Sequence, residues 1–267
     1  MVIPTILLIF LVLYLFAIKG RLGHKDLPAL RNWHYAHRGL HKEGIPENSL
    51  AAFAAAKNAG FGIELDIHLL KDGNLAVIHD ASLKRTAGVD VCIENLTSED
   101  LNQYRLEGTN EKIPLFSDVL ALVNGEVPLI VELKSVDHNY TALCEAACKV
   151  LEDYKGFYCM ESFDPRCILW LKKNKNEILR GQLAYNLFRV DVKIPAIMKF
   201  FLRHNLINFA IKPDFIAYGF ADRKIFSNFL CRKVWRMQGV TWTIRSKEDL
   251  DIAMQEGWIA VFEKFDP

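Results

Sequence analysis

The chain has 267 residues, of which 51% are hydrophobic and 24% charged, with a formal net charge of +1. This length allows one large α/β barrel or two small domains, and the nearly balanced charge predicts no nucleic-acid partner. Six cysteines are scattered without a Cys-x-x-Cys or Cys/His spacing, which indicates neither a zinc site nor a disulfide framework.

The first segment, residues 2–18, is an uncharged apolar run that Lys19, Arg21 and Lys25 follow at once. It is at the short end of what crosses a bilayer as a helix. No basic region precedes it and no cleavage site follows, which favours an uncleaved anchor over a signal peptide. A buried helix is the alternative. The basic flank predicts that the rest of the chain faces the cytoplasm. We expect three segments: a transmembrane anchor (1–19), a linker (20–33) and a globular domain (34–267).

Short apolar runs alternate with helical patterns along the rest of the chain, which is typical of a parallel sheet. The runs 62–67 and 75–79 are separated by a short segment with Asp72-Gly73, a strong hairpin signal. Parallel neighbours need a crossover of a dozen or more residues, so we expect an antiparallel pair here. The other runs predict a (β/α)8 TIM barrel with a β-hairpin insertion after its second strand. The candidate strands are 35–37, 62–67, 75–79, 128–133, 157–161, 179–184, 214–217, 240–243 and 258–262.

Helices are expected between these strands. An alanine-rich helix at residues 50–59 has Asn48 or Ser49 as its N-cap. Thr97 or Ser98 is expected to cap another helix. Further helical patterns lie at residues 117–123, 140–154, 165–173 and 247–256.

Carboxylates lie on two of the predicted barrel strands. Glu64 and Asp66 are two residues apart, so on a strand both side chains point to one face. Glu132 interrupts the apolar run 128–133, where a charge needs a reason. Active sites of such barrels lie at the C-terminal ends of the strands. Because buried carboxylates need a cation, the three predict a site for a hard divalent ion, Ca2+ or Mg2+.

Two histidines could transfer protons at such a site. His37 and His79 come from different segments, and the pKa of imidazole lies near neutrality. Arg38 and Lys134 could hold the oxygens of a phosphate. Each residue alone also has a structural explanation, since a histidine at a strand end or a carboxylate on a solvated face is common. Together they favour metal-assisted hydrolysis of a phosphodiester, with the acid, the base and the nucleophile left open.

These motifs resemble the glycerophosphodiester phosphodiesterases, whose pattern reads His-Arg-Gly, Pro-Glu-Asn-Thr, Glu-x-Asp, Asp-Gly, His-Asp and Glu-x-Lys. The resemblance covers residues 35–262 and is densest before residue 135. It implies a barrel of the phospholipase C-like phosphodiesterase type that releases glycerol 3-phosphate and an alcohol. The motifs lie at residues 37–39, 46–49, 64–66, 72–73, 79–80 and 132–134.

The resemblance also implies roles for individual residues. Phe163 and Trp242 would line the glycerol side of the substrate, although a place in the core explains them nearly as well. The chain departs from the family where Glu263-Lys264 replaces a usual Thr-Asp. The resemblance therefore implies no role for the residues at the end of the last strand. The other implied roles are metal binding by Glu64, Asp66 and Glu132, acid/base catalysis by His37 and His79, and phosphate binding by Arg38 and Lys134.

We therefore expect a metal-dependent hydrolase of small glycerophosphodiesters. The alternative is a membrane-directed lysophospholipase D that uses the same site on lipids. Basic residues and phenylalanines interleave over residues 199–236, which would suit a lipid contact but also ordinary barrel helices. A catalytically silent binding barrel is disfavoured because both histidines and all three carboxylates are present. The expected partners are a small or lipid-derived phosphodiester and, through the N-terminal helix, a membrane.

Overall fold

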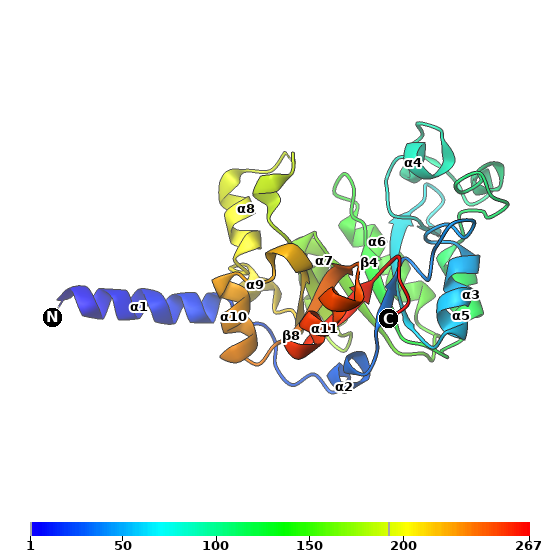
Figure 1. Cartoon of the computed structure of the whole chain (residues 1–267). Coiled ribbons are helices and arrows are strands. Elements are labelled where there is room, and N and C mark those ends of the chain that lie inside the picture. The colour runs from blue at the N-terminus through cyan, green and yellow to red at the C-terminus, as the bar shows by residue number, and fades with distance from the viewer. Residues whose placement is uncertain (1, 192) are drawn as a thin grey trace.

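The computed structural model describes residues 2–191 and 193–267, and within them nine strands form a single sheet. The strand order is β1-β9-β8-β7-β6-β5-β4-β2-β3, and an added β1–β2 pairing closes eight strands into a barrel. Neighbours in the barrel are parallel, and helices surround it (Figure 1), which confirms the predicted (β/α)8 barrel. The barrel strands are β1 (Tyr35–His37), β2 (Gly62–Leu69), β4 (Leu129–Leu133), β5 (Tyr158–Ser162), β6 (Arg180–Ala184), β7 (Phe215–Gly219), β8 (Gln238–Ile244) and β9 (Trp258–Phe262).

The predicted hairpin insertion is also present. Strand β3 (Leu75–Val77) folds back antiparallel on β2, with Val77 opposite Ile67. In the turn, Gly73 has a φ of +84°, a conformation that glycine adopts without steric cost. The hairpin delivers the chain to the barrel mouth just before His79.

The helices follow the expected pattern with one exception. Ser49 caps the alanine-rich helix by accepting a hydrogen bond from the backbone N–H of Ala52 (3.1 Å). The helix expected after Ser98 is only a 3-10 turn, Asp100–Gln103, although Thr97 and Asp100 form the reciprocal side-chain contacts of a capping box. The helices are α2 (Leu27–Arg31), α3 (Leu50–Asn58), α4 (Lys84–Ala87), α5 (Phe116–Val123), α6 (Tyr140–Val150), α7 (Pro165–Asn174), α8 (Ala196–Arg203), α9 (Asn208–Ile211), α10 (Phe226–Lys233) and α11 (Lys247–Gln255).

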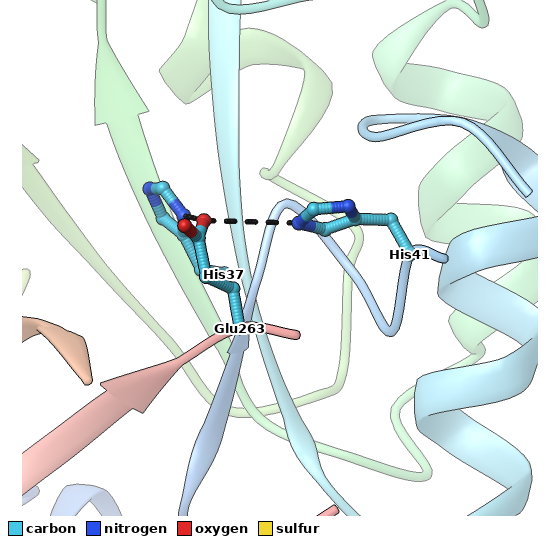
Figure 2. Close-up of side chains that lie close together, drawn as sticks. All are labelled: His37, His41 and Glu263. Carbon is cyan, nitrogen blue, oxygen red and sulfur yellow. Dashed lines mark hydrogen bonds and ion pairs between the residues drawn. The ribbon is translucent and has the colours of Figure 1, made fainter. Parts of the chain in front are cut away.

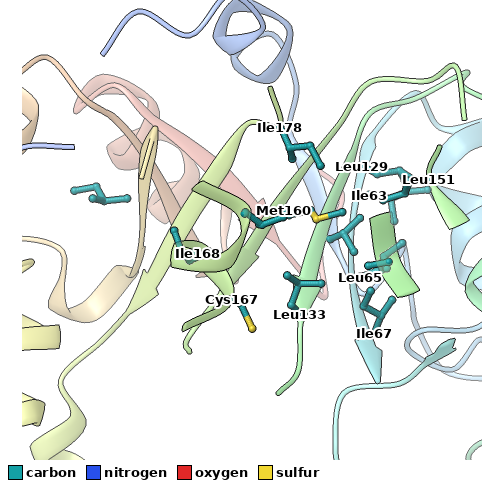
Figure 3. Close-up of a cluster of buried hydrophobic side chains, with 14 of the residues drawn as sticks. Ile63, Leu65, Ile67, Leu129, Leu133, Leu151, Met160, Cys167, Ile168 and Ile178 are labelled. Atoms are coloured by element: carbon teal, nitrogen blue, oxygen red, sulfur yellow. The ribbon is translucent and has the colours of Figure 1, made fainter. Parts of the chain in front are cut away.

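The main core lies between the barrel and its helices. Ile63, Leu65 and Ile67 of β2 are buried there, as Figure 3 shows, against neighbours such as Leu133 and Met160. Because side chains alternate along a strand, the intervening residues of β2 must point to the opposite face. The apolar packing of β2 therefore fixes its two carboxylates in the barrel interior.

The predicted membrane anchor is wrong, and so are the membrane localisation and orientation that were inferred from it. No helix within residues 2–191 and 193–267 is long and apolar enough to cross a bilayer. Helix α1 (Val2–Ala17) has 16 residues. A helix of that length rises about 24 Å, which is less than a hydrocarbon core of about 30 Å. Met1, which the prediction included, lies outside the described residues.

The end of α1 and the segment after it pack against the barrel, although α1 itself projects away from it (Figure 1). The indole N–H of Trp235 donates to the Leu15 carbonyl (2.9 Å), and Ile18 is fully buried. Arg21 pairs with Asp214 at the start of β7. The segment expected to be a linker is therefore tied to the domain at several points.

Candidate active site

Four buried carboxylates face the interior of the barrel mouth. Asp66, Glu132 and Glu161 are direct neighbours across β2, β4 and β5, and Glu64 lies two residues before Asp66. Oxygens of Glu64, Asp66 and Glu132 all lie within 4.8 Å of one another. The structure thus brings together the three predicted metal ligands, and an all-oxygen donor set of this kind suits a hard divalent cation.

The electrostatics of this cluster also fit a cation. Burial raises the pKa of Glu132 to about 7 and, together with the nearby Asp66 charge, raises that of Glu64 well above its usual value. Burial would raise the pKa of Asp66 too, but the ammonium of Lys134 at 3.0 Å, the neighbouring His79 and Arg38 and a hydrogen bond from Asn48 together outweigh it and hold that pKa far below the ordinary value. The carboxylates repel one another, and a divalent ion would relieve that repulsion.

Two basic side chains lie against the carboxylates. Lys134 Nζ is 2.8 Å from Glu132 Oε1, in addition to its contact with Asp66. Arg38 Nε lies 3.5 Å from Asp66 Oδ2, and its Nη1 donates to Glu47 Oε1 at 2.8 Å. Arg38 and Lys134, which the sequence assigns to phosphate binding, both line one cavity, where they can contact the oxygens of an anionic ligand.

The loop after β1 holds Arg38 in this position. Gly39 has a φ of +80°, and a Cβ there would lie 2.8 Å from the backbone of Ala52 in α3. Any other residue would therefore force the loop away from the helix. The backbone N–H of Arg38 donates to Glu64 Oε2 (3.1 Å), which links the His-Arg-Gly motif directly to the carboxylate cluster.

His37 is held by a carboxylate that the sequence had left without a role. Its ring lies beside the Glu263 carboxylate (Figure 2), with Nδ1 2.6 Å from Oε2, and its Nε2 is 4.0 Å from Glu64 Oε2. Because a carboxylate accepts, Nδ1 carries the proton and Nε2 is the nitrogen that can act on a ligand. Burial lowers the pKa of His37, and the hydrogen bond to Glu263 opposes that shift.

Glu263 also gathers two further groups. Arg245 Nε donates to its Oε1 at 2.7 Å, and His41 Nε2 lies 3.8 Å from its Oε2. Ligand atoms of His37, His41 and Glu263 lie within 4.8 Å of one another, as in a metal site. The charge of Glu263 is nevertheless already neutralised by Arg245, and its other oxygen is hydrogen-bonded to His37. This arrangement indicates that Glu263 orients the His37 ring and does not bind a metal.

His79 has a similar environment on the other side of the cluster. Its Nδ1 lies 2.6 Å from Asp80 Oδ1, and Arg85 holds the other oxygen of that carboxylate. The Nε2 of His68 is 3.1 Å from the carbonyl of His79, which fixes the backbone. Burial lowers the pKa of His79 to about 4. Both predicted histidines therefore pair Nδ1 with a carboxylate and line one cavity.

That cavity has a volume of about 790 Å³ and a second, aromatic side. Phe163, Tyr185 and Trp242 stand nearly perpendicular to one another, with centroids 5.4 to 5.9 Å apart. The structure thus places Phe163 and Trp242 at the site. An adjoining cavity of about 820 Å³ shares His37 and Arg38 with the first and has more charged walls.

The site residues missed from the sequence include Glu161, Tyr185 and Glu263. Glu161 and Glu263 each end an apolar strand run with a charge, the same signal that had marked Glu132. That signal could have identified both. Tyr185 follows β6 without a comparable sign, since a tyrosine after a strand is common.

A model of the glycerophosphoryl diester phosphodiesterase family matches residues 37–217, which include both histidines and all four carboxylates of the barrel interior. The chain belongs to this family. The membership agrees with the resemblance that the sequence motifs had suggested.

Individual family members are similar to parts of the chain. A glycerophosphodiester phosphodiesterase of Bacillus altitudinis is 36% identical over 130 residues, which are 45% of this chain and 53% of that protein. A lysophospholipase D of Rattus norvegicus is 33% identical over 135 residues, 46% of this chain and 41% of that protein. The chain thus spans about half the length, or less, of these curated relatives.

Solved structures share the fold over most of the domain. A phosphodiesterase of Oleispira antarctica, solved with its product sn-glycerol-3-phosphate, has a TM-score of 0.73 at 22% identity and covers 88% of this chain and 94% of its own. A protein of Silicibacter pomeroyi described as a glycerophosphoryl diester phosphodiesterase has a TM-score of 0.72 at 18% identity, with 90% and 94% covered. At these identities the likeness shows the fold alone.

Proposed function

We propose that this member of the family hydrolyses glycerophosphodiesters to glycerol 3-phosphate and an alcohol. The observation that carries the proposal is the convergence of Glu64, Asp66 and Glu132 within 4.8 Å in a cavity that His37 and His79 also line. Family membership supports phosphodiester hydrolysis, and the structural neighbour solved with sn-glycerol-3-phosphate supports a small glycerol phosphate as product.

In this proposal the three carboxylates hold one divalent cation, Ca2+ or Mg2+. When bound, that cation supplies positive charge for the phosphoryl oxygens and lowers the pKa of a coordinated hydroxyl group or water. Arg38 and Lys134 bind the same phosphate through their donors. The bound cation and the two basic side chains thereby balance the negative charge of the three carboxylates.

The two histidines transfer protons. One Nε2 accepts the proton of the attacking water or hydroxyl group, and the other histidine, protonated on both ring nitrogens, donates its Nε2 proton to the oxygen of the departing alcohol. Each ring is oriented by the carboxylate at its Nδ1, Glu263 for His37 and Asp80 for His79. Because the environments of His37 and His79 are alike, we assign the acid and base roles to the two histidines together and not to one residue each.

Phe163 and Trp242 form the apolar wall against which the carbon atoms of the glycerol moiety pack. Phe163 follows the end of β5 and Trp242 lies on β8, and their rings contact each other at 88° with the centroids 5.6 Å apart. Carbon atoms packed there would lose contact with water, which favours binding without a direct part in the chemistry.

A second candidate function is lysophospholipase D activity at the same site. The similarity to the Rattus norvegicus lysophospholipase D favours it, and so does the apolar rim of the cavity, where the side chain of Val190 is 38% exposed. An acyl chain on the glycerol would need such an apolar surface at the mouth.

The test is product analysis over a panel of diesters. Chelator-treated protein, with Ca2+ or Mg2+ added back, is expected to release glycerol 3-phosphate from glycerophosphocholine and glycerophosphoglycerol. Cleavage of micellar lysophosphatidylcholine alone would favour the second function. Release of phosphocholine and free glycerol, or no cleavage with either metal, would refute the proposal.

A further inference from the structure

Glu161 is a buried carboxyl group that the proposed reaction does not use. It lies on β5, is 2% exposed and lines the main cavity. Its Oε2 has no hydrogen-bond partner within residues 2–191 and 193–267. A buried polar atom without a partner is costly, so a group that approaches from the cavity would be favoured.

The position of Glu161 separates it from the metal cluster. It pairs with Glu132 on one side and with Gly181 on the other, so it is one strand farther from Asp66 than Glu132 is. Among the described residues, the three carboxylates that could share an ion do not include it. Glu161 therefore lies between the charged cluster and the aromatic wall.

The aromatic wall offers a second unpartnered polar atom. The Nε1 of Trp242 is buried and has no partner among the described residues, and Phe163, two residues after Glu161 and just beyond β5, packs its ring against that of Trp242 with the centroids 5.6 Å apart. This end of the cavity thus combines a hydrogen-bond acceptor and a donor with aromatic rings. A hydroxyl group on a short carbon chain matches both, because it donates one hydrogen bond and accepts another.

We propose that Glu161 binds the glycerol hydroxyl group farthest from the phosphorus, with Trp242 Nε1 donating to the same oxygen. This assignment rests on the proposed function, and it names the free terminal hydroxyl as the feature that the site selects. A lysophospholipid acylated at that oxygen has no proton to donate there and is disfavoured. Glu161 is then a specificity-determining residue of the β5–β8 side.

The experiment compares glycerophosphocholine with 2-hydroxypropyl phosphocholine, which lacks only the terminal hydroxyl group. We expect the wild-type chain, with Mg2+, to prefer glycerophosphocholine in kcat/KM by on the order of 100-fold, since a site built for a hydroxyl group rejects a ligand without it. Glu161→Leu should lower kcat/KM for glycerophosphocholine by a similar factor and leave the analogue within a few-fold. Glu161→Gln, which keeps an acceptor, should restore most of the preference.

Two controls separate this role from others. Asp249→Leu removes a different carboxylate that lines the same cavity and should leave the preference intact. The Mg2+ concentration for half-maximal activity should be the same in Glu161→Leu as in wild type. A higher requirement would make Glu161 a metal ligand and overturn the assignment.

The remaining outcomes are equally decisive. An equal loss on both substrates in Glu161→Leu would indicate a structural role and overturn the assignment, as would an unchanged preference. In both cases wild-type cleavage of glycerophosphocholine would leave the proposed function standing. Wild-type protein that cleaves no diester would refute the proposed function itself, together with this inference.

Discussion

The two halves of the barrel mouth differ in chemistry. The half formed by β1, β2 and β4 carries His37, 4.0 Å from Glu64, and the ion pairs of Lys134 with Asp66 (3.0 Å) and Glu132 (2.8 Å). The half formed by β5 to β8 is mainly aromatic, with Glu161 as its buried carboxyl group. The contrast indicates that the charged half carries out the reaction and the aromatic half selects the substrate. Buried charges are tolerated only where opposite charges lie beside them, and the ion pairs of the first half meet that condition.

If that division is correct, the largest losses should follow changes at the histidines. His37→Ala and His79→Ala should each reduce kcat by about 100- to 10,000-fold, the range expected for a positioned acid or base. Steady-state kinetics on glycerophosphocholine measure the effect, and circular dichroism checks the fold. Turnover close to wild type in either variant would remove that histidine from the proposed pair.

A smaller loss is expected where a residue acts through a histidine. Glu263→Gln keeps the size of the side chain but weakens the hold on His37 Nδ1, so kcat should fall by about 10- to 100-fold. The neighbouring Lys264→Ala is the matched control, because Lys264 is exposed. A rise in KM with kcat unchanged would mean that Glu263 belongs to the binding half.

The charged half should also show a pH-dependent affinity for metal. Burial raises the pKa of Glu132 to about 7, and a metal binds only the ionised carboxylate. Below pH 7 the ion must displace that proton, so affinity should fall by at least tenfold per pH unit, because burial also raises the pKa of Glu64, a second ligand of the same ion. Calorimetric titration with Mn2+ at pH 6, 7 and 8 measures it. Affinity that is constant, or that rises in acid, would contradict the assignment of Glu132.

The smallest effect is expected on the aromatic side. Trp242→Leu retains an apolar side chain but loses part of the ring contact, so KM should rise several-fold with little change in kcat. Measuring both constants on glycerophosphocholine sharpens the contrast with the histidines. A large loss of kcat at constant KM would place Trp242 in the reacting half instead.

The sequence predicted the reacting half better than the other half. Asp72-Gly73 identified the hairpin, and the spacing of Glu64 and Asp66 placed both on one strand face, because these signals lie within a few residues. The bond between His37 and Glu263 joins residues 226 positions apart. Only the closure of β1 against β9 brings them together, so no local pattern could show it.

The N-terminal prediction failed for a different reason. The uncharged run of residues 2–18 is at the short end of what crosses a bilayer, but helix α1 has only 16 residues, and no helix in the described part of the chain is long and apolar enough for a span. The chain then turns at once, and Ile18 is buried against the barrel. Composition alone could not show that the helix would end there.

The most direct test of the account is anomalous diffraction from crystals soaked in Mn2+. The account predicts a single strong peak among the oxygens of Glu64, Asp66 and Glu132, on the side that faces the two histidines. A peak bounded instead by His37, His41 and Glu263, or no peak at the carboxylates at saturating Mn2+, would contradict it.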